Sequence, residues 1–278
     1  MLFLEHIADE LAVEGKDVIR WKLQADLASG RLVLTEVAVI NGTLHHTWTF
    51  SVLSRDLDPS QISLQPEDSS GVRYLNAISV FYRKAVEGTC VSSHRPLRQE
   101  QFVKLSLPMA GDPADPEQIA RSLRDFLVTC GARPPAVRPE IIREQLALLH
   151  AAIAPATRLF VPNERGTECI ASLSDDRLLL FSEMRPKQSA PSRRTFELLS
   201  LDTKTIHLCK GTGGWVVTLS AVERIETTLW EISPGSFDRE CIMRVLFPTQ
   251  VQAERFAATC VRVVPEIQQR LYAVHSEN

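Results

Sequence analysis

Two stretches of the sequence end in the same way and set the expected architecture: Phe102–Pro108 reads FVKLSLP, and Ile242–Pro248 reads IMRVLFP. Each is mostly apolar, as in a strand that packs on a core, and a proline is expected to end the strand because it lacks the N–H that a ladder needs. Each precedes an apolar helical pattern with a central phenylalanine, Phe126 or Phe256. This repeat predicts two consecutive modules that each close with a C-terminal helix.

Outward from these stretches, apolar residues at helical spacing predict the helices. Closing helices are expected over Ile119–Cys130, ended by Gly131, and over Val251–Val264. The same spacing predicts that each module also opens with a helix, over Leu4–Leu11 in the first and over Ile141–Ile153 in the second.

Between the helices, alternating apolar and polar residues predict antiparallel strands. Asn41-Gly42 is a strong hairpin signal, because both positions tolerate the positive φ of a type I′ turn. Asp56–Pro59 is expected to end a strand. The expected strands of the first module are Ile19–Ala25, Leu32–Val39, His46–Val52, Ile62–Leu64, Ala77–Tyr82, Thr89–Ser92 and Phe102–Leu107. Those of the second are Cys169–Leu173, Leu178–Phe181, Phe196–Leu199, Thr205–Cys209, Trp215–Leu219, Ile225–Trp230 and Cys241–Phe247.

A proline-rich segment, Ala132–Pro139, separates the two sets of strands. It holds few large apolar residues, which is typical of a semi-rigid linker. We therefore expect an N-terminal module at residues 1–132, a linker at 133–139 and a C-terminal module at 140–278. The predicted fold class is α+β, mainly antiparallel β.

Composition and charge favour a globular, cytoplasmic protein. The 31 basic and 34 acidic residues give a net charge of −3, without the positive excess of a general phosphate-backbone binder, which argues against a nucleic-acid partner. The six cysteines form no C-x-x-C pair, and we interpret them as buried structural thiols. No apolar run reaches the roughly 18–20 residues of a membrane span, so no transmembrane segment is expected. Acidic residues interrupt the apolar N-terminus, which argues against an export signal.

Familiar catalytic and cofactor motifs are missing from the sequence. Lys210–Gly214 is glycine-rich, but a strand pattern follows it rather than a helix, so we interpret it as a hairpin turn and not as a phosphate loop. His45 and His46 are adjacent, and neighbours on a strand point to opposite faces, so they are not expected to bind one metal ion. We predict no cofactor, no metal site and no enzymatic activity. An active site assembled from distant residues is the alternative.

One local feature points to a ligand. Residues 185–194 carry four positive charges and no acidic residue in an expected loop between two strands. The four charges are Arg185, Lys187, Arg193 and Arg194. Basic residues in such a loop can bind a phosphorylated headgroup or another anion. The alternative interpretation is a solvated loop.

The order of about seven strands followed by one helix resembles the pleckstrin-homology (PH) superfold. The resemblance extends from Thr167 to Tyr272, and from Val18 to Gly131 in the first module. PH domains usually carry a tryptophan in the closing helix, where this sequence has Phe126 and Phe256. The resemblance implies two tandem β-barrel or sheet modules of a superfold that hosts lipid-headgroup, peptide and protein binders. Open antiparallel sheets packed under helices are the alternative.

Together these patterns predict a non-enzymatic binding or scaffold protein that recognises a protein or peptide partner on a sheet edge or a helix-flanked groove. Peripheral binding to anionic phosphoinositide lipids through the basic loop is the alternative. We expect ligand contact in the second module, and packing or homodimer contact in the first.

Overall fold

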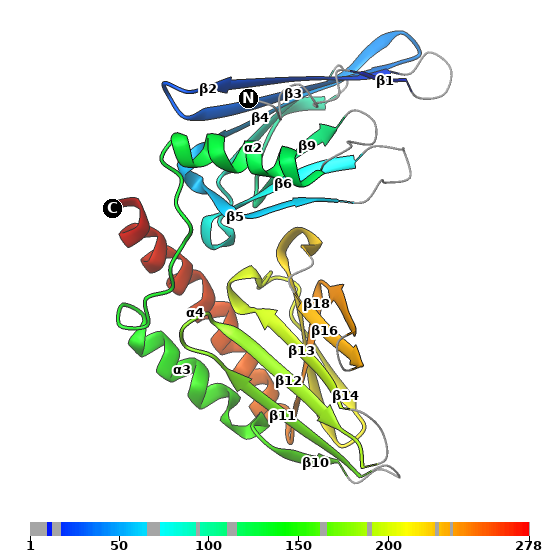
Figure 1. Cartoon of the computed structure of the whole chain (residues 1–278). Helices are drawn as coiled ribbons and strands as arrows, with labels where there is room; N and C mark the ends of the chain where they lie inside the picture. The colour runs from blue at the N-terminus through cyan, green and yellow to red at the C-terminus, as the bar shows by residue number, and fades with distance from the viewer. Residues whose placement is uncertain are drawn as a thin grey trace. The chain divides into compact units, whose positions relative to one another are not determined.

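The computed structural model describes residues 10–12, 18–65, 73–92, 95–109, 116–161, 166–187, 191–225, 228–233 and 236–277. This described part is mixed α+β, with four antiparallel sheets and three α-helices, and none of its sheets closes into a barrel. The chain divides into two compact units, Met1–Pro135 (unit 1) and Ala136–Asn278 (unit 2), which Figure 1 shows in blue to green and in green to red. The division falls within the proline-rich segment.

Unit 1 contains a six-stranded sheet of order β1-β2-β3-β4-β7-β8 and a three-stranded sheet of order β5-β6-β9. Helix α2 packs on β5 and on the short 3-10 helix η1. The strands are β1 (Glu10–Ala12), β2 (Val18–Asp26), β3 (Arg31–Ile40), β4 (Thr43–Leu53), β5 (Leu57–Leu64), β6 (Arg73–Ser79), β7 (Val86–Ser92), β8 (Arg95–Phe102) and β9 (Lys104–Met109). The helices are η1 (Ser54–Asp56), η2 (Val80–Tyr82) and α2 (Pro116–Thr129).

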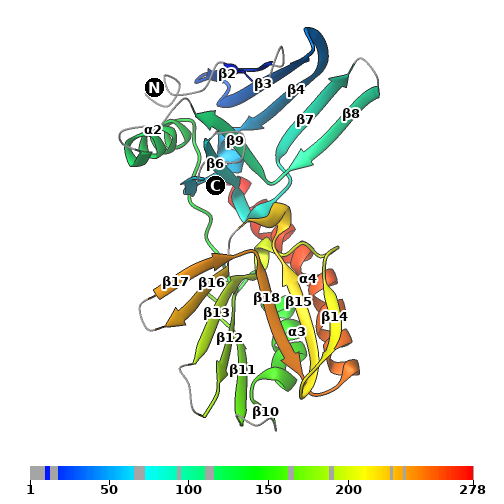
Figure 2. The same ribbon diagram turned by 90° about the vertical axis from the view of Figure 1, so that its right-hand side faces the viewer.

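Unit 2 repeats this topology, with a six-stranded sheet of order β10-β11-β12-β13-β16-β17 and a three-stranded sheet of order β14-β15-β18. Helices α3 and α4 pack side by side (Figure 2), and α4 also contacts β15 and β18. The strands are β10 (Leu159–Val161), β11 (Thr167–Leu173), β12 (Leu179–Arg185), β13 (Ser192–Glu197), β14 (His207–Gly211), β15 (Gly214–Ser220), β16 (Thr228–Ser233), β17 (Ser236–Glu240) and β18 (Ile242–Phe247). The helices are α3 (Arg143–Ile153), η3 (Ala154–Ala156), η4 (Leu198–Ser200), η5 (Val222–Arg224) and α4 (Gln250–Glu277).

The corners where the chain passes from one sheet to the other give a residue-by-residue correspondence between the units. Gly30 precedes β3 with φ 62°, and Leu178 precedes β12 with φ 52°. The carbonyl of Gly30 accepts a hydrogen bond from Ser54 N at 2.6 Å, and that of Leu178 accepts one from Leu198 N at 3.0 Å. These bonds align β3 and β4 with β12 and β13.

A second corner is repeated in the same detail. Ser79 N donates to Val103 O in unit 1, and Ala221 N donates to Cys241 O in unit 2, both at 2.8 Å. Val103 separates β8 from β9, and Cys241 separates β17 from β18. The repeat expected from the two strand–helix stretches is therefore a repeat of the entire two-sheet arrangement.

The core of unit 1 lies between its two sheets and α2. It includes Trp21, Leu34 and Leu107 from the strands and Leu123 and Phe126 from the helix. In unit 2, the phenylalanines of the repeated stretch meet across the interface of sheet and helix. The rings of Phe247 and Phe256 lie 5.1 Å apart. The apolar stripes that predicted α2, α3 and α4 thus face the sheets or each other.

Several expectations are corrected. The helix predicted over Leu4–Leu11 is wrong at its end, because Glu10–Ala12 forms β1 and pairs with β2; residues 1–9 lie outside the described part. The single strand over Phe102–Leu107 is two strands. Pro59 and Pro108 do not end strands but lie within β5 and β9, which are the edges of their sheet, where the missing N–H is tolerated.

Candidate functional site

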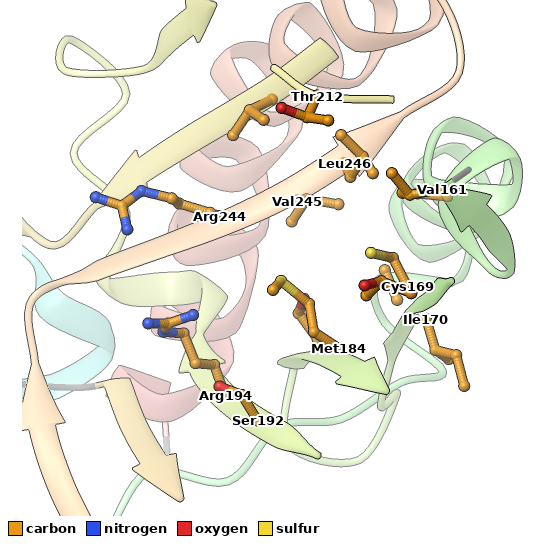
Figure 3. Close-up of a pocket in the computed structure, with 15 residues that line it drawn as sticks. Val161, Cys169, Ile170, Met184, Ser192, Arg194, Thr212, Arg244, Val245 and Leu246 are labelled. Carbon is orange, nitrogen blue, oxygen red and sulfur yellow. The ribbon is translucent and has the colours of Figure 1, made fainter. Parts of the chain in front are cut away.

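A pocket of about 530 Å³ lies in unit 2, lined by residues from both of its sheets (Figure 3). Pockets that hold small ligands have volumes of roughly 300–1,000 Å³. The apolar lining residues are Ala156, Val161, Ile170, Ala171, Met184, Val216, Val245 and Leu246. The polar ones are Thr167, Cys169, Ser182, Ser192, Arg194, Thr212 and Arg244.

The strand register explains why these side chains meet. Cys169 pairs with Met184, Ala171 pairs with Ser182, and Met184 also pairs with Ser192. Paired residues of antiparallel strands share a face, so these side chains form one surface of the six-stranded sheet. Strands β15 and β18 of the smaller sheet supply the opposite wall.

Unit 1 fills the corresponding space with large side chains. By the corner correspondence, Ser182 stands where unit 1 has Leu34, and Cys169 stands where it has Trp21. Trp21 and Leu34 are 5% and 3% exposed and belong to the core of unit 1. The Trp21 indole N–H donates to Glu36 Oε2 at 2.9 Å. Unit 2 has a pocket because small side chains occupy positions that a repeat of unit 1 would fill.

Three further positions at the edge of this space also differ between the units, and again unit 1 has the larger apolar side chains. In unit 1, the rings of Trp48 and Phe50 stack with centroids 5.5 Å apart, and Phe102 meets both edge-on. At the three equivalent positions unit 2 has Ser192, Arg194 and Glu240. Arg194 Nε lies 3.4 Å from Glu240 Oε2. An aromatic cluster has thus been replaced by a charged pair.

Arg194 and Arg244 give the pocket a positive end. They come from β13 and β18, one from each sheet, and both lie at the same side of the pocket in Figure 3. The Arg194 side chain is 17% exposed, whereas Arg244 is exposed. Within the described residues, Arg194 pairs with Glu240 and no ion pair involves Arg244.

The glycine-rich turn at Lys210–Gly214 forms the β14–β15 hairpin, as predicted. It also closes the far side of the pocket, where Thr212 and Val161 lie (Figure 3). Gly213 has φ 87°, and a Cβ at this position would lie 2.4 Å from Val161 Cγ1. Glycine is therefore required both by the backbone conformation and by the close approach of the turn to β10.

Three of the four predicted ligand-binding residues lie in strands, not in a loop. Arg185 ends β12, and Arg193 and Arg194 lie in β13; residues 188–190 are outside the described part. Glu183, whose side chain is 3% exposed, lies 2.8 Å from Arg185 Nη2 and 3.1 Å from Arg193 Nε. Arg193 Nη1 also lies 3.3 Å from Glu231 Oε2.

These contacts hold the pKa of Glu183 below its ordinary value, chiefly through the hydrogen bond from Arg185, with Arg193 contributing. Buried carboxylates need such partners, because their desolvation costs several kcal/mol when it is not compensated. Arg185 and Arg193 therefore have a structural task. Of the four predicted residues only Arg194 lines the pocket, and anion binding by the other three stays a prediction.

Lys187 differs from the three arginines. Its Nζ lies 5.7 Å from the centroid of the Phe160 ring, a cation–π contact. Phe160 and Met184 are 61% and 47% exposed. A cation and exposed apolar side chains thus gather at this end of β10 and β12.

The two adjacent histidines do not follow the expected alternation. The pairing of β3 with β4 shifts register between Ala38 and Val39, which pair with His46 and Leu44, so His45 lies at a bulge. At this bulge, His45 Nδ1 and His46 Nδ1 lie 2.9 Å apart. Among the described residues, no group of three or more His, Cys, Asp or Glu side chains could hold a metal ion.

The cysteines are six unpaired thiols. Cys260 is buried, which raises the pKa of its thiol to about 12, as expected for a structural cysteine. Cys209 is exposed, contrary to that interpretation. Cys169 lines the pocket, and burial together with the charge of Glu168 raises the pKa of its thiol.

Comparisons with protein-family models, with curated proteins and with solved structures found no match to this chain. No helix among the described residues is both long and apolar enough to cross a membrane.

Sequence reasoning missed most of the pocket. Cys169, Ser182, Ser192 and Arg244 are ordinary residues in ordinary strand patterns. The signal that could have found them is the internal repeat, provided that it is aligned at the corners and not only at Phe102–Pro108 and Ile242–Pro248.

Proposed function

We propose that the chain is a non-enzymatic binding protein and that the pocket of unit 2 takes up an apolar group of its ligand. The observation that carries this proposal is the replacement of Trp21 and Leu34 by Cys169 and Ser182 in an otherwise repeated fold. Opening this space gives up the burial of large side chains, which contributes about 1.5–3 kcal/mol each. A bound apolar group would restore that burial.

The lining supports binding more than catalysis. Its titratable side chains are Cys169, Arg194 and Arg244. The raised pKa of its thiol keeps Cys169 protonated and therefore a poor nucleophile. A guanidinium stays protonated at ordinary pH and cannot act as a base. Among the residues that the structure describes, the lining therefore places no general base beside a nucleophile.

A protein or peptide partner, which the sequence suggested, would use the pocket by inserting one apolar side chain. Such anchors dominate the energy of many interfaces. We include in this proposal the resemblance of both units to the PH superfold. Two antiparallel sheets followed by a helix in each unit support that resemblance. A homodimer contact through unit 1 stays a prediction.

The experiment is a titration of the full chain with the neutral, environment-sensitive dye Nile red. The wild type is expected to bind one dye in unit 2. Ser182→Leu, which places the unit 1 residue in the pocket, should weaken binding at least tenfold. Ser172→Leu is the matched control, because it makes the same change on the exposed face of the neighbouring strand β11.

Peptides selected from a displayed random library on the wild-type chain, and not retained by Ser182→Leu, should displace the dye. Equal dye binding by Ser182→Leu and the wild type would contradict the proposal. If no selected peptide displaces the dye, the prediction of a peptide partner is wrong, whereas the proposal that the pocket binds an apolar group stands.

A second candidate is binding to an anionic lipid surface, favoured by the exposed Lys187, Phe160 and Met184 at one end of unit 2. A juxtaposed cation and apolar side chains suit the interface of a membrane. Anionic liposomes should then retain the chain more than neutral ones. Lys187→Gln should reduce retention more than Arg193→Gln, because Arg193 is already paired with Glu183 and Glu231.

A further inference from the structure

We infer that the ligand of the unit 2 pocket is an amphiphilic anion: an apolar chain that lies between the two sheets and ends in a carboxylate held by Arg244 and Arg194. This inference rests on the proposed binding function and names the class of ligand. The apolar body of the pocket and its positive end are separate features, and together they match a molecule with one apolar part and one anionic part.

The apolar part is provided by side chains on both walls. Val161 and Ala171, 4% and 3% exposed, belong to the six-stranded sheet, and Val245, fully buried, belongs to β18. Leu246 is partly exposed and Met184 is exposed, and both also line the pocket. An unbranched hydrocarbon chain suits such a space, because it fits an irregular apolar volume without needing hydrogen bonds.

The two arginines favour an anionic part in the ligand. A guanidinium offers a planar fork of N–H donors that matches a carboxylate. Arg194 and Arg244 lie at the same side of the pocket and come from different sheets (Figure 3), so the guanidinium groups available to an anion are gathered at this end. A cationic ligand at this end would face two positive charges.

Glu240 makes the inference sharper. Its Oε2 lies 3.4 Å from Arg194 Nε, and its side chain is 31% exposed. An entering carboxylate competes with Glu240 for Arg194 and is also repelled by it. Glu240 therefore occupies the place beside Arg194 that the ligand's anionic group would take, and removing its charge should strengthen the binding of an anion.

The contrast with unit 1 supports the same ligand class. Unit 1 has Phe50 and Phe102 where unit 2 has Arg194 and Glu240, and Ser106 where unit 2 has Arg244. Ser106 Oγ donates to Asn76 Oδ1 at 2.7 Å, so that position is neutral and internally satisfied. At these three positions the charged groups are thus found in unit 2 and not in unit 1.

The test uses the full chain and three probes of equal chain length, each below its critical micelle concentration: dodecanoate, dodecanol and dodecyltrimethylammonium. Isothermal titration calorimetry and Nile red displacement give the dissociation constants. Dodecanoate should bind roughly tenfold or more tightly than dodecanol, since hydrogen bonds to charged groups are the strong ones. The ammonium probe should bind most weakly.

Two variants should change the affinity for the anionic probe alone, in opposite directions. Arg244→Gln should weaken the binding of dodecanoate roughly tenfold, and Glu240→Gln should strengthen it several-fold. Both should leave the dissociation constant of dodecanol within twofold of the wild-type value. Arg262→Gln, which removes an exposed arginine from α4, is the matched control and should change neither probe.

Each contrary outcome contradicts either the anionic ligand class or the binding pocket itself. If dodecanol and Nile red bind but dodecanoate has no advantage, the anionic class is wrong and the proposed binding function stands. If no probe binds, both are wrong. Retention by vesicles of phosphatidylcholine and phosphatidylserine that depends on Lys187, without binding of monomeric dodecanoate, would assign the anion site to a lipid surface and overturn the pocket.

Discussion

Unit 1 and unit 2 share the same strand order, the same corner hydrogen bonds and a closing helix, but they differ in what lies between their sheets. Unit 1 places Trp21, Leu34 and Phe50 there. Unit 2 places Cys169, Ser182 and Arg194 at the same positions. One framework therefore supports either a packed interior or a pocket, and the difference lies in side-chain size and charge on the inner face of the larger sheet.

The outer faces of the two sheets differ as well. In unit 2 the side chains of Glu183, Arg185 and Arg193 form an ion-pair network across β12 and β13. The equivalent residues of unit 1 are Thr35, Val37 and Thr49, all uncharged. We suggest that the network helps to hold the strands of unit 2 in register where its inner face is less well packed.

The largest expected effect comes from opening unit 1. Trp21→Ala should lower the free energy of unfolding of unit 1 by about 3–5 kcal/mol, because it leaves a cavity in the core. The equivalent change in unit 2, Cys169→Ala, should cost about 1 kcal/mol or less. Native-state hydrogen exchange of amides in β2–β4 and in β11–β13 separates the two values. Equal losses would mean that the two positions are not equivalent.

The next effect concerns the buried carboxylate of unit 2. Removing both partners in Arg185→Ala/Arg193→Ala leaves Glu183 buried and unpaired, which should destabilise unit 2 by about 3 kcal/mol. Lys187→Ala, a neighbouring charge without this task, should stay within about 0.5 kcal/mol. Urea unfolding measures both. A double variant as stable as the wild type would show that Glu183 does not depend on the arginines.

Acid should distinguish the units through the same residue. The folded pKa of Glu183 lies below its ordinary value of 4.5, so its contribution to stability is present above that pH and is lost as the pH falls through the folded pKa. Unit 2 should therefore lose protection from hydrogen exchange below about pH 4.5, whereas unit 1, with Thr35 at this position, should lose less. Glu183→Gln should be less stable at pH 7 but less sensitive to acid. Identical pH profiles for both units would be inconsistent with this role.

The smallest effect tests a shared corner. Phe81 in η2 and Glu223 in η5 both have positive φ, 53° and 50°. Phe81 is 4% exposed and fills the core of its corner, so replacing it with glycine should destabilise unit 1. Glu223 is half-buried, and Glu223→Gly should stabilise unit 2 by about 0.5–1 kcal/mol, because glycine adopts this conformation without strain. Thermal unfolding checks the sign.

The sequence predicted most of the framework for physical reasons that are local. Asn41-Gly42 formed its hairpin, and the stripes of α2, α3 and α4 form helices, because periodicity and turn preference depend only on neighbouring residues. The edge strand β8 was missed because its described side chains from Pro96 to Gln101 are polar or exposed and show no apolar alternation. Strand β10 was missed because it has three residues.

The pocket could not be predicted in the same way. A cavity forms where the side chains of several strands leave space unfilled, so no single residue or local pattern predicts it. Arg194 was singled out as part of a basic loop. That it lines one pocket with Arg244 depends on how two sheets are assembled, because β13 pairs with β12 in the larger sheet and β18 pairs with β15 in the smaller one. The loop interpretation was wrong for Arg185, Arg193 and Arg194, which lie in strands. Glu183 pairs with the first two of these arginines, and Glu231 also pairs with Arg193.

The most direct test of the central claim is methyl chemical-shift mapping of the full chain during a titration with dodecanoate. We predict shifts in the methyl groups of Val161, Val216, Val245 and Leu246 of unit 2, and none in Leu23 and Leu34 of unit 1, with the shifts lost in Ser182→Leu. Shifts distributed equally over both units, or unchanged in Ser182→Leu, would contradict the claim that unit 2 alone has exchanged packing for a binding pocket.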